Sequence, residues 1–267
     1  MILIIAKESN SKRKQNNFLI TMNIQINGWN DEYGIIRKKV IIDVMNIMYT
    51  IFKNDALYEN NLIISNSYSV DCAFADDEPC THPDRSKVCI SCTGAFWCQF
   101  VHQLSHELCH CSTSRIQLPQ PIKWFDEFIC CCSSFLMEKY ISISTNGKYD
   151  YMFGNNTAET FREYLEINQS GHIYQVENTK EFFTIHRTQY ETNQNRIKNH
   201  DVFVYEFFHR IGQNWSGLSF VGKMWKVNLD GCFSIEEYLS RLSISCTSEE
   251  NVILNIIKEI FGIGCIV

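Results

Sequence analysis

The chain has 267 residues, of which 45% are hydrophobic, and its formal net charge is -6 at pH 7. This length and apolar content can fill a hydrophobic core without disulfides or repeats. Only four prolines occur and no Gly/Ser-rich stretch interrupts the chain, so no linker is obvious. Basic residues are scattered apart from the cluster Lys12-Arg13-Lys14, which is typical of a solvated tail. A nucleic-acid partner is therefore not expected.

A membrane partner is not expected either. Residues 1–6 are apolar, but this stretch is too short for the core of a signal peptide, and its charges follow it instead of preceding it. Elsewhere the apolar helical regions are interrupted by Gln, His or Glu within a turn or two, which excludes a membrane-spanning helix. We therefore expect a cytoplasmic protein.

The first part of the chain predicts one helix and two strands. Residues 1–30 are interpreted as a tail, and residues 33–54 have the apolar spacing of an amphipathic helix. Residues 62–68 and 87–93 predict strands, separated by the acidic loop at 76–79.

The next helix carries the most informative motif of the chain. Residues 96–111 place an apolar stripe at helical spacing, and His106-Glu107-Leu108-Cys109-His110 lies inside it. One helical turn separates the two histidines, so both imidazoles project from one face and can bind the same ion. Glu107 lies beside them, where a general base is needed. The pattern H-E-x-x-H therefore predicts a zinc site with catalytic chemistry.

A catalytic zinc needs a third ligand, and the sequence offers one soon afterwards. A turn at 119–121 precedes a predicted helix that continues to about Tyr140, and Glu127 lies in its first turns. Residues 111–126 leave sixteen positions between His110 and Glu127, enough to fold one helix back against the other. We expect the Glu127 carboxylate to be buried among apolar neighbours, which is costly unless it binds a metal. Asp126 is the alternative ligand, or a supporting group.

These residues resemble the gluzincin arrangement of the thermolysin and aminopeptidase families. Their second helix carries an Asn-Glu or Trp-Leu-Asn-Glu signature, which Trp124-Phe-Asp-Glu127 resembles, with Asp126 where those families often have Asn. The run Trp97 to His110 is also similar to uncharacterised bacterial zincin-like proteins. The resemblance implies an α+β fold, with a zincin-like lobe at 31–145 and a mostly helical lobe at 146–267 that together form one compact unit.

The resemblance also implies a function, that of a zinc-dependent peptidase. Zinc on His106, His110 and Glu127 would polarise water and the scissile carbonyl, while Glu107 takes a proton and passes it to the leaving amine. The expected partner is a peptide or protein substrate. In zincins the strand just before the active helix usually lies at the sheet edge and pairs with an extended peptide, and residues 87–93 are that strand here.

Beyond Tyr140 the sequence predicts helices at 157–168, 200–210, 235–242 and 249–261. This half is expected to form the other wall of the cleft. Zincins commonly place a His, Tyr or Arg there to stabilise the oxyanion. The candidates of those types that we consider in this half are His186, Tyr190, His200, His209 and Arg210.

Alternatives to an active peptidase remain open. The motif could be a solvated polar face, with Glu127 an ordinary first-turn acid. A protein of this fold could also bind zinc without catalysis and serve a regulatory or interaction role, or it could be a regulatory peptidase acting on repressor-like proteins. A fourth protein ligand such as Cys131 would favour a structural zinc.

Thirteen cysteines are many for this length, but their odd number and the run at 130–132 do not resemble a disulfide framework. We expect most of them to be reduced and buried. A second zinc site would use the group Cys80, His82, Cys89 and Cys92. The alternating strand pattern of residues 88–92 places Cys89 and Cys92 on opposite faces, which argues against such a site.

Overall fold

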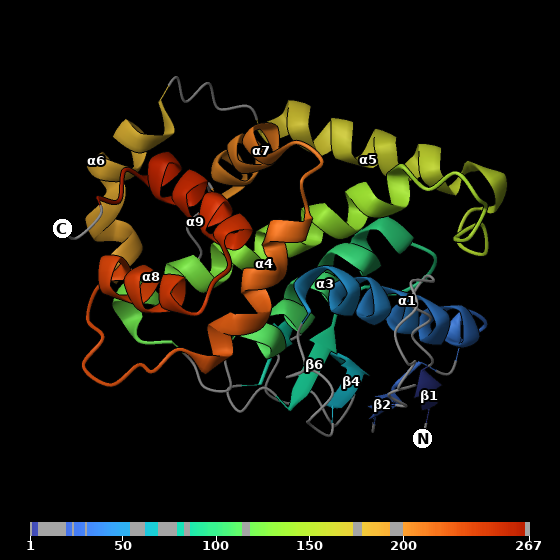
Figure 1. The fold of residues 1–267 in the computed structure, drawn as a ribbon. Coiled ribbons are helices and arrows are strands. Elements are labelled where there is room, and N and C mark those ends of the chain that lie inside the picture. Colours follow the sequence, from blue (N-terminus) through green and yellow to red (C-terminus); the bar gives the residue numbers. More distant parts are fainter. Residues whose placement is uncertain are drawn as a thin grey trace, which may run out of the picture.

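Helices make up most of the structure, and a small sheet lies at one edge of it, below α1 and α3 in Figure 1. The computed structural model describes residues 2–4, 20–22, 24–29, 31–53, 62–68, 79–82, 86–113, 118–172, 178–192 and 200–264. Its elements are β1 (Ile2–Ile4), β2 (Ile20–Met22), β3 (Ile24–Asn27), α1 (Gly34–Phe52), β4 (Leu62–Asn66), β5 (Cys80–Thr81), β6 (Lys87–Ile90), α3 (Trp97–Thr113), α4 (Gln120–Ser142), η2 (Gly154–Asn156), α5 (Thr157–His172), α6 (Thr179–Thr192), α7 (His200–Ile211), η3 (Ser216–Lys226), α8 (Ile235–Ile244) and α9 (Ser248–Phe261). The expected α+β class is confirmed.

The sheet has four strands in the order β3-β4-β6-β5. Strands β3, β4 and β6 are parallel, with Ile26 opposite Ile64 and Ile64 opposite Val88, whereas β5 runs antiparallel to β6. The prediction that residues 87–93 form the edge strand is therefore wrong. Strand β6 is flanked on both sides, and among the described strands β5 is the one at that edge, beside α3. Strand β5 pairs with the nearby β6, with Thr81 opposite Val88, but two residues are too few to show an alternating strand pattern, so the sequence did not predict it.

The N-terminal segment contributes more than the expected tail. Strand β3 joins the main sheet, and β1 pairs with β2 in a separate antiparallel ribbon. The helices predicted from apolar spacing are confirmed within a few residues at each end, whereas α6 and the 3-10 segment η3 were not expected. Among the described residues, no helix combines the length and the apolar character that crossing a bilayer requires.

Helix α4 is the centre of the helical part, and its buried aromatic side chains explain why the C-terminal helices surround it (Figure 1). Trp124 packs against Phe183 of α6 and Phe261 of α9, at 4.8 and 4.9 Å between ring centroids. Phe128 contacts the same Phe261 and also Phe207 of α7. These contacts continue into a single hydrophobic cluster that also includes α1 and α3. The face of α4 opposite this aromatic face is thereby directed towards α3.

Arg37 of α1 holds the turn that precedes α3. Its guanidinium donates hydrogen bonds to Asp31 Oδ1 at 2.5 Å and to the backbone oxygen of Gly94 at 2.7 Å. Gly94 has a φ of 66°, a conformation that glycine adopts without strain. The Arg37 side chain is 0% exposed, because it lies within about 6 Å of the centroids of three aromatic rings, those of Trp29, Tyr33 and Trp97. The entry into the motif-bearing helix is therefore fixed from α1.

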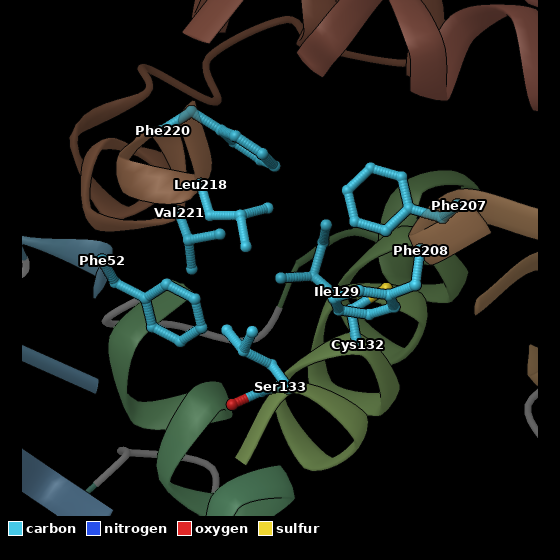
Figure 2. Close-up of a pocket in the computed structure, with 10 residues that line it drawn as sticks. Phe52, Ile129, Cys132, Ser133, Phe207, Phe208, Leu218, Phe220 and Val221 are labelled. Carbon is cyan, nitrogen blue, oxygen red and sulfur yellow. The ribbon is translucent and has the colours of Figure 1, made fainter. Parts of the chain in front are cut away.

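An apolar pocket lies between α1, α4, α7 and η3 (Figure 2). Aromatic and aliphatic side chains line most of it, together with the thiol of Cys132 and the hydroxyl of Ser133. The Ser133 oxygen is buried and has no hydrogen-bond partner in the described part of the chain. By contrast, the hydroxyl of the next residue, Ser134, donates to the backbone oxygen of His102 at 2.9 Å.

Ser133→Ala should therefore stabilise the protein by about 1 kcal/mol, because a buried hydroxyl without a partner costs free energy in the folded state. Ser134→Ala is the matched control. Both side chains are fully buried, but Ser134 loses a hydrogen bond, so its variant should be less stable by about 1 kcal/mol. Equilibrium urea unfolding measures both effects. A loss of stability in Ser133→Ala equal to that in Ser134→Ala would contradict the assignment.

Candidate metal centre

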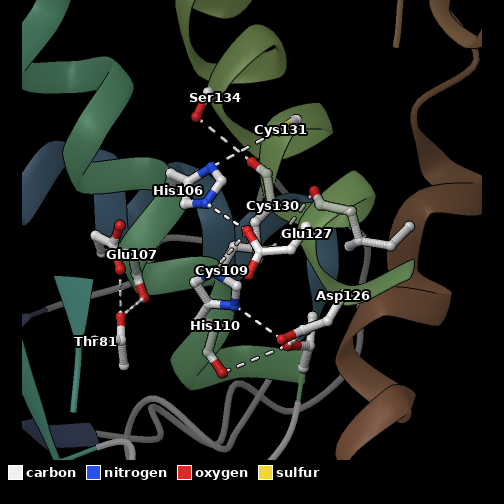
Figure 3. A network of polar contacts seen from close by, with 12 residues as sticks. Thr81, His106, Glu107, Cys109, His110, Asp126, Glu127, Cys130, Cys131 and Ser134 are labelled. Atoms are coloured by element: carbon white, nitrogen blue, oxygen red, sulfur yellow. Dashed lines mark hydrogen bonds and ion pairs between the residues drawn. The ribbon is translucent and has the colours of Figure 1, made fainter. Parts of the chain in front are cut away.

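Three side chains from two antiparallel helices converge between α3 and α4 (Figure 3). Oε2 of Glu127 is 3.4 Å from Nε2 of His106 and 3.6 Å from Nε2 of His110. One potential ligand atom from each of the three residues lies within 4.8 Å of the others. The two imidazoles, one helical turn apart, are 5.0 Å apart between ring centroids. The three residues that the sequence predicted as ligands are thus brought together.

The Glu127 carboxylate differs from the expectation in its exposure. The prediction that it is buried among apolar neighbours is confirmed only in part, since 37% of its side chain is exposed. Trp124, Phe128 and Ile129 are buried, but they face the C-terminal helices, whereas Glu127 lies on the side of α4 that faces α3. The three-residue group therefore has an open side.

Asp126 supports His110 rather than joining the convergent atoms. Its Oδ2 is 2.8 Å from Nδ1 of His110, and its other oxygen accepts a hydrogen bond from the hydroxyl of Thr113. Nδ1 is thereby occupied and Nε2 is directed towards Glu127. A carboxylate on the second ring nitrogen is the usual way in which proteins orient a metal-binding histidine. Of the two roles left open for Asp126, the supporting one fits this geometry.

The carboxylates of Asp126 and Glu127 stabilise the charged form of His110, and the imidazoles of the two histidines stabilise the charged form of Glu127. Burial lowers the pKa of His110, but the carboxylates of Asp126 and Glu127 outweigh it and raise that pKa well above its ordinary value. Burial raises the pKa of Glu127, but the two imidazoles outweigh it and hold that pKa far below its usual range. Without a metal, a protonated His110 balances one of the two negative charges of Asp126 and Glu127. A cation that replaces this proton would meet the same negative charge.

Asp126→Asn should lower zinc affinity by about 10- to 100-fold, the usual cost of losing a group that orients a metal ligand. The amide keeps the size of the side chain but removes its charge, so His110 loses its anionic partner. Asp43→Asn is the control, because Asp43 accepts a hydrogen bond from Tyr151 at 2.7 Å and forms no part of the three-residue group. Competition with a chromogenic chelator measures both affinities, and equal affinities would contradict this role.

Glu107 is held by the edge strand. Its side chain is buried, at 6% exposed, and the hydroxyl of Thr81 lies 2.7 Å from its Oε2 and 2.9 Å from its backbone oxygen (Figure 3). Because Thr81 belongs to β5, this contact joins the sheet edge to the motif on α3. Sequence reasoning missed Thr81, since nothing local predicts that a two-residue strand reaches the motif.

Two cysteines of α4 lie near the group without completing it. The sulfur of Cys131 is 4.0 Å from Nδ1 of His106, on the ring edge away from Nε2. Cys130 forms a second possible metal group with His110 and Asp126. Burial raises the pKa of Cys130 well above its ordinary value. In this second group His110 Nδ1 and Asp126 already contact each other, whereas in the first group the Nε2 atoms of both histidines face Glu127. The first group is therefore the better candidate.

The alternative second zinc site is not assembled. Among the described residues, which include all four of its members, the possible metal groups are the two given above. Cys89 is disulfide-bonded, so it is no ligand and it departs from the expectation of reduced cysteines. Ten other cysteines in the described part of the chain form no disulfide, and most of them are buried, as expected.

The residues proposed as oxyanion donors in the C-terminal half have other contacts. Tyr190 packs against Trp124 and Phe183 within the aromatic core. His186 lies against Phe182, with 4.5 Å between ring centroids. Arg210 pairs with two glutamates of α7 and α9, and its neighbour His209 is exposed. The side chain of His200 lies outside the described part of the chain.

The comparisons with known proteins add nothing to this geometry. No family model, curated protein or solved structure matches the chain. The function of the chain must therefore be inferred from the side chains of α3, α4 and β5.

Proposed function

We propose that this protein is a zinc-dependent hydrolase that cleaves peptides. The observation that carries the proposal is the convergence of His106, His110 and Glu127, two imidazole nitrogens and one carboxylate oxygen within 4.8 Å. Two histidines and a glutamate are a common ligand set of catalytic zinc in proteases. The half-exposed carboxylate of Glu127 leaves this set open on one side, as catalysis requires.

The donor set fits zinc on chemical grounds. Imidazole nitrogen and carboxylate oxygen are ordinary zinc ligands, and the His110 ring already has the orienting carboxylate that such ligands usually have. When bound, zinc would polarise water and the carbonyl of a substrate. Among the described residues, no fourth side chain joins the group of three, and this favours a catalytic over a structural role.

Glu107 is the residue to which we assign proton transfer. It follows His106 directly on α3 and is the carboxylate of the motif that is not a ligand. The Thr81 hydroxyl engages its Oε2, which leaves Oε1 to accept a proton from water and to return it to the leaving amine. Thr81 would thus hold the base in place.

The sheet edge supports a peptide as the substrate. Strand β5 is the last strand of the described sheet on the side of α3, and Thr81 links it to Glu107. A peptide that adds to β5 as a further strand would lie beside the motif. This transfers to β5 the binding role that was expected of residues 87–93.

The second candidate is a zinc-binding regulatory or interaction protein without catalysis. The shared metal group supports it equally, and the two proposals differ in Glu107. A protein that only binds zinc needs no buried carboxylate beside the ligands, whereas here a threonine of the neighbouring strand holds one in place. This contact favours the hydrolase.

To test this proposal, zinc-loaded and metal-free protein are each incubated with an unbiased peptide mixture. The products are then identified by mass spectrometry. The proposal predicts new cleavage products that appear only with zinc and that disappear after chelation. Zinc binding without any cleavage would contradict the hydrolase and favour the regulatory alternative.

A further inference from the structure

The turn that follows α4 contains an Asn-Gly pair, Asn146-Gly147, in an open setting. Both residues are exposed, and so are their neighbours Thr145 and Lys148. The backbone N–H of Gly147 has no hydrogen-bond partner in the described part of the chain. The carboxamide oxygen of Asn146 accepts a hydrogen bond from the Thr145 hydroxyl at 3.3 Å. The Asn146 carboxamide and the Gly147 nitrogen are therefore not held by the sheet or by a helix.

The fold requires glycine at position 147. Its φ is 60°, a conformation that residues with side chains rarely adopt, and an added Cβ would lie 2.8 Å from Oδ2 of Asp150. The backbone oxygen of Gly147 also accepts the hydrogen bond that closes the turn, from the Asp150 N–H at 3.1 Å. Because glycine has no side chain, the approach to its backbone nitrogen is not blocked.

A second Asn-Gly pair, Asn27-Gly28, provides an internal comparison. Gly28 is also exposed and also has a positive φ, of 84°. The two asparagines differ, because Asn27 is the last residue of β3 and pairs with Ser65 in the parallel ladder with β4. The same two residue types thus occur once in the sheet and once in an exposed turn.

We propose that Asn146 is a site of spontaneous deamidation, in which the backbone nitrogen of Gly147 attacks Cγ of Asn146. Asparagine is among the thermolabile residue types. A bond forms between this nitrogen and Cγ, which closes a cyclic imide, and the side-chain nitrogen leaves as ammonia with the proton that Gly147 loses. Water then opens the imide at either of its carbonyl groups. The products are aspartate and isoaspartate, in which the main chain runs through Cγ, and no electrons are gained or lost.

The Thr145 hydroxyl favours this reaction. Negative charge develops on Oδ1 of Asn146 as the imide closes, and a hydrogen bond already directed at this oxygen stabilises that charge. Isoaspartate would lengthen the main chain shortly before Tyr149, whose side chain is buried at 2% exposed. The modification would therefore alter the turn that places this buried ring. The proposal does not depend on the metal centre.

The test is a time course of the full-length protein at mildly alkaline pH, followed by digestion and by chromatography and mass spectrometry of the peptides. We expect both aspartate and isoaspartate to appear at position 146. Conversion at Asn27 should be about tenfold slower, because β3 must first separate from β4. In concentrated urea, which unfolds the sheet, the two sites should convert at similar rates.

Variants at two positions test the chemistry of the turn. Thr145→Val removes the hydroxyl but keeps the size of the side chain, so it should slow conversion of Asn146 by about two- to tenfold, the effect of losing one hydrogen bond. Thr145→Ser is the matched control, because it keeps the hydroxyl and should keep the native rate. Asn146→Gln should show no conversion at this position over the same time course, since its longer side chain would have to close a larger ring.

Equal rates at Asn146 and Asn27 in the folded protein would overturn the proposal. Aspartate without isoaspartate at position 146 would also overturn it, because opening of the imide gives both products. An unchanged rate in Thr145→Val would overturn the role assigned to the Thr145 hydroxyl.

Discussion

Glu107→Gln should retain zinc and the native fold while peptide hydrolysis falls by about 10²- to 10⁴-fold, the usual contribution of a general base. The amide has the size of the carboxylate, and its oxygen can still accept the hydrogen bond of Thr81. The packing around α3 should therefore persist. What disappears is the ability to take a proton from water, because an amide is not a base at neutral pH.

Steady-state kcat/KM on a peptide cleaved by the native protein measures this effect. Glu163→Gln is the control, since Glu163 is an exposed residue of α5 and should leave kcat/KM unchanged. Elemental analysis of the same samples separates loss of catalysis from loss of zinc. Full activity in Glu107→Gln would remove Glu107 from the mechanism, even if the metal group is correct.

Glu127→Ala should weaken zinc binding by more than the roughly 10- to 100-fold expected for an orienting residue, because it removes a direct ligand. The fold should survive, since the partly exposed Glu127 side chain is not part of the hydrophobic core. In the native protein zinc should raise the unfolding temperature, because it binds the folded state. In Glu127→Ala this increase should be small or absent.

Thermal unfolding with and without zinc, combined with chelator competition, provides the measurement. Glu163→Ala is the matched control, an exposed glutamate of α5 whose loss should not change zinc affinity. Native-like zinc affinity in Glu127→Ala would exclude it as a ligand. The group His110, Asp126 and Cys130 would then become the better candidate.

Much of the helical structure could be predicted, because the apolar spacing that forms the core is local in sequence. Helices α1, α3 and α4 have buried faces that recur every three or four residues. Strand β5 could not be predicted because two residues are too short to show a strand pattern, and the place of β6 inside the sheet depends on that strand and on parallel pairing with the more distant β4. Segment η3 was not predicted for another reason: its 3-10 geometry lacks the periodicity of an α-helix.

The three convergent residues were within reach of sequence reasoning because the motif fixes His106 and His110 on one face, and Pro119 and Pro121 mark the start of α4, which packs against α3. The partial exposure of Glu127 could not be predicted from the sequence. Its apolar neighbours suggested burial, but they face the C-terminal helices across α4. Thr81 is also a long-range partner of the motif, because it lies 26 residues before Glu107.

The most direct test of the account is the zinc stoichiometry of the purified protein, measured by elemental analysis after metal removal and dialysis against zinc. The account predicts one zinc per chain in the native protein and in Glu107→Gln, and its loss in Glu127→Ala. Equal zinc in all three proteins, or none in any, would contradict the three-residue metal centre on which the proposed function depends.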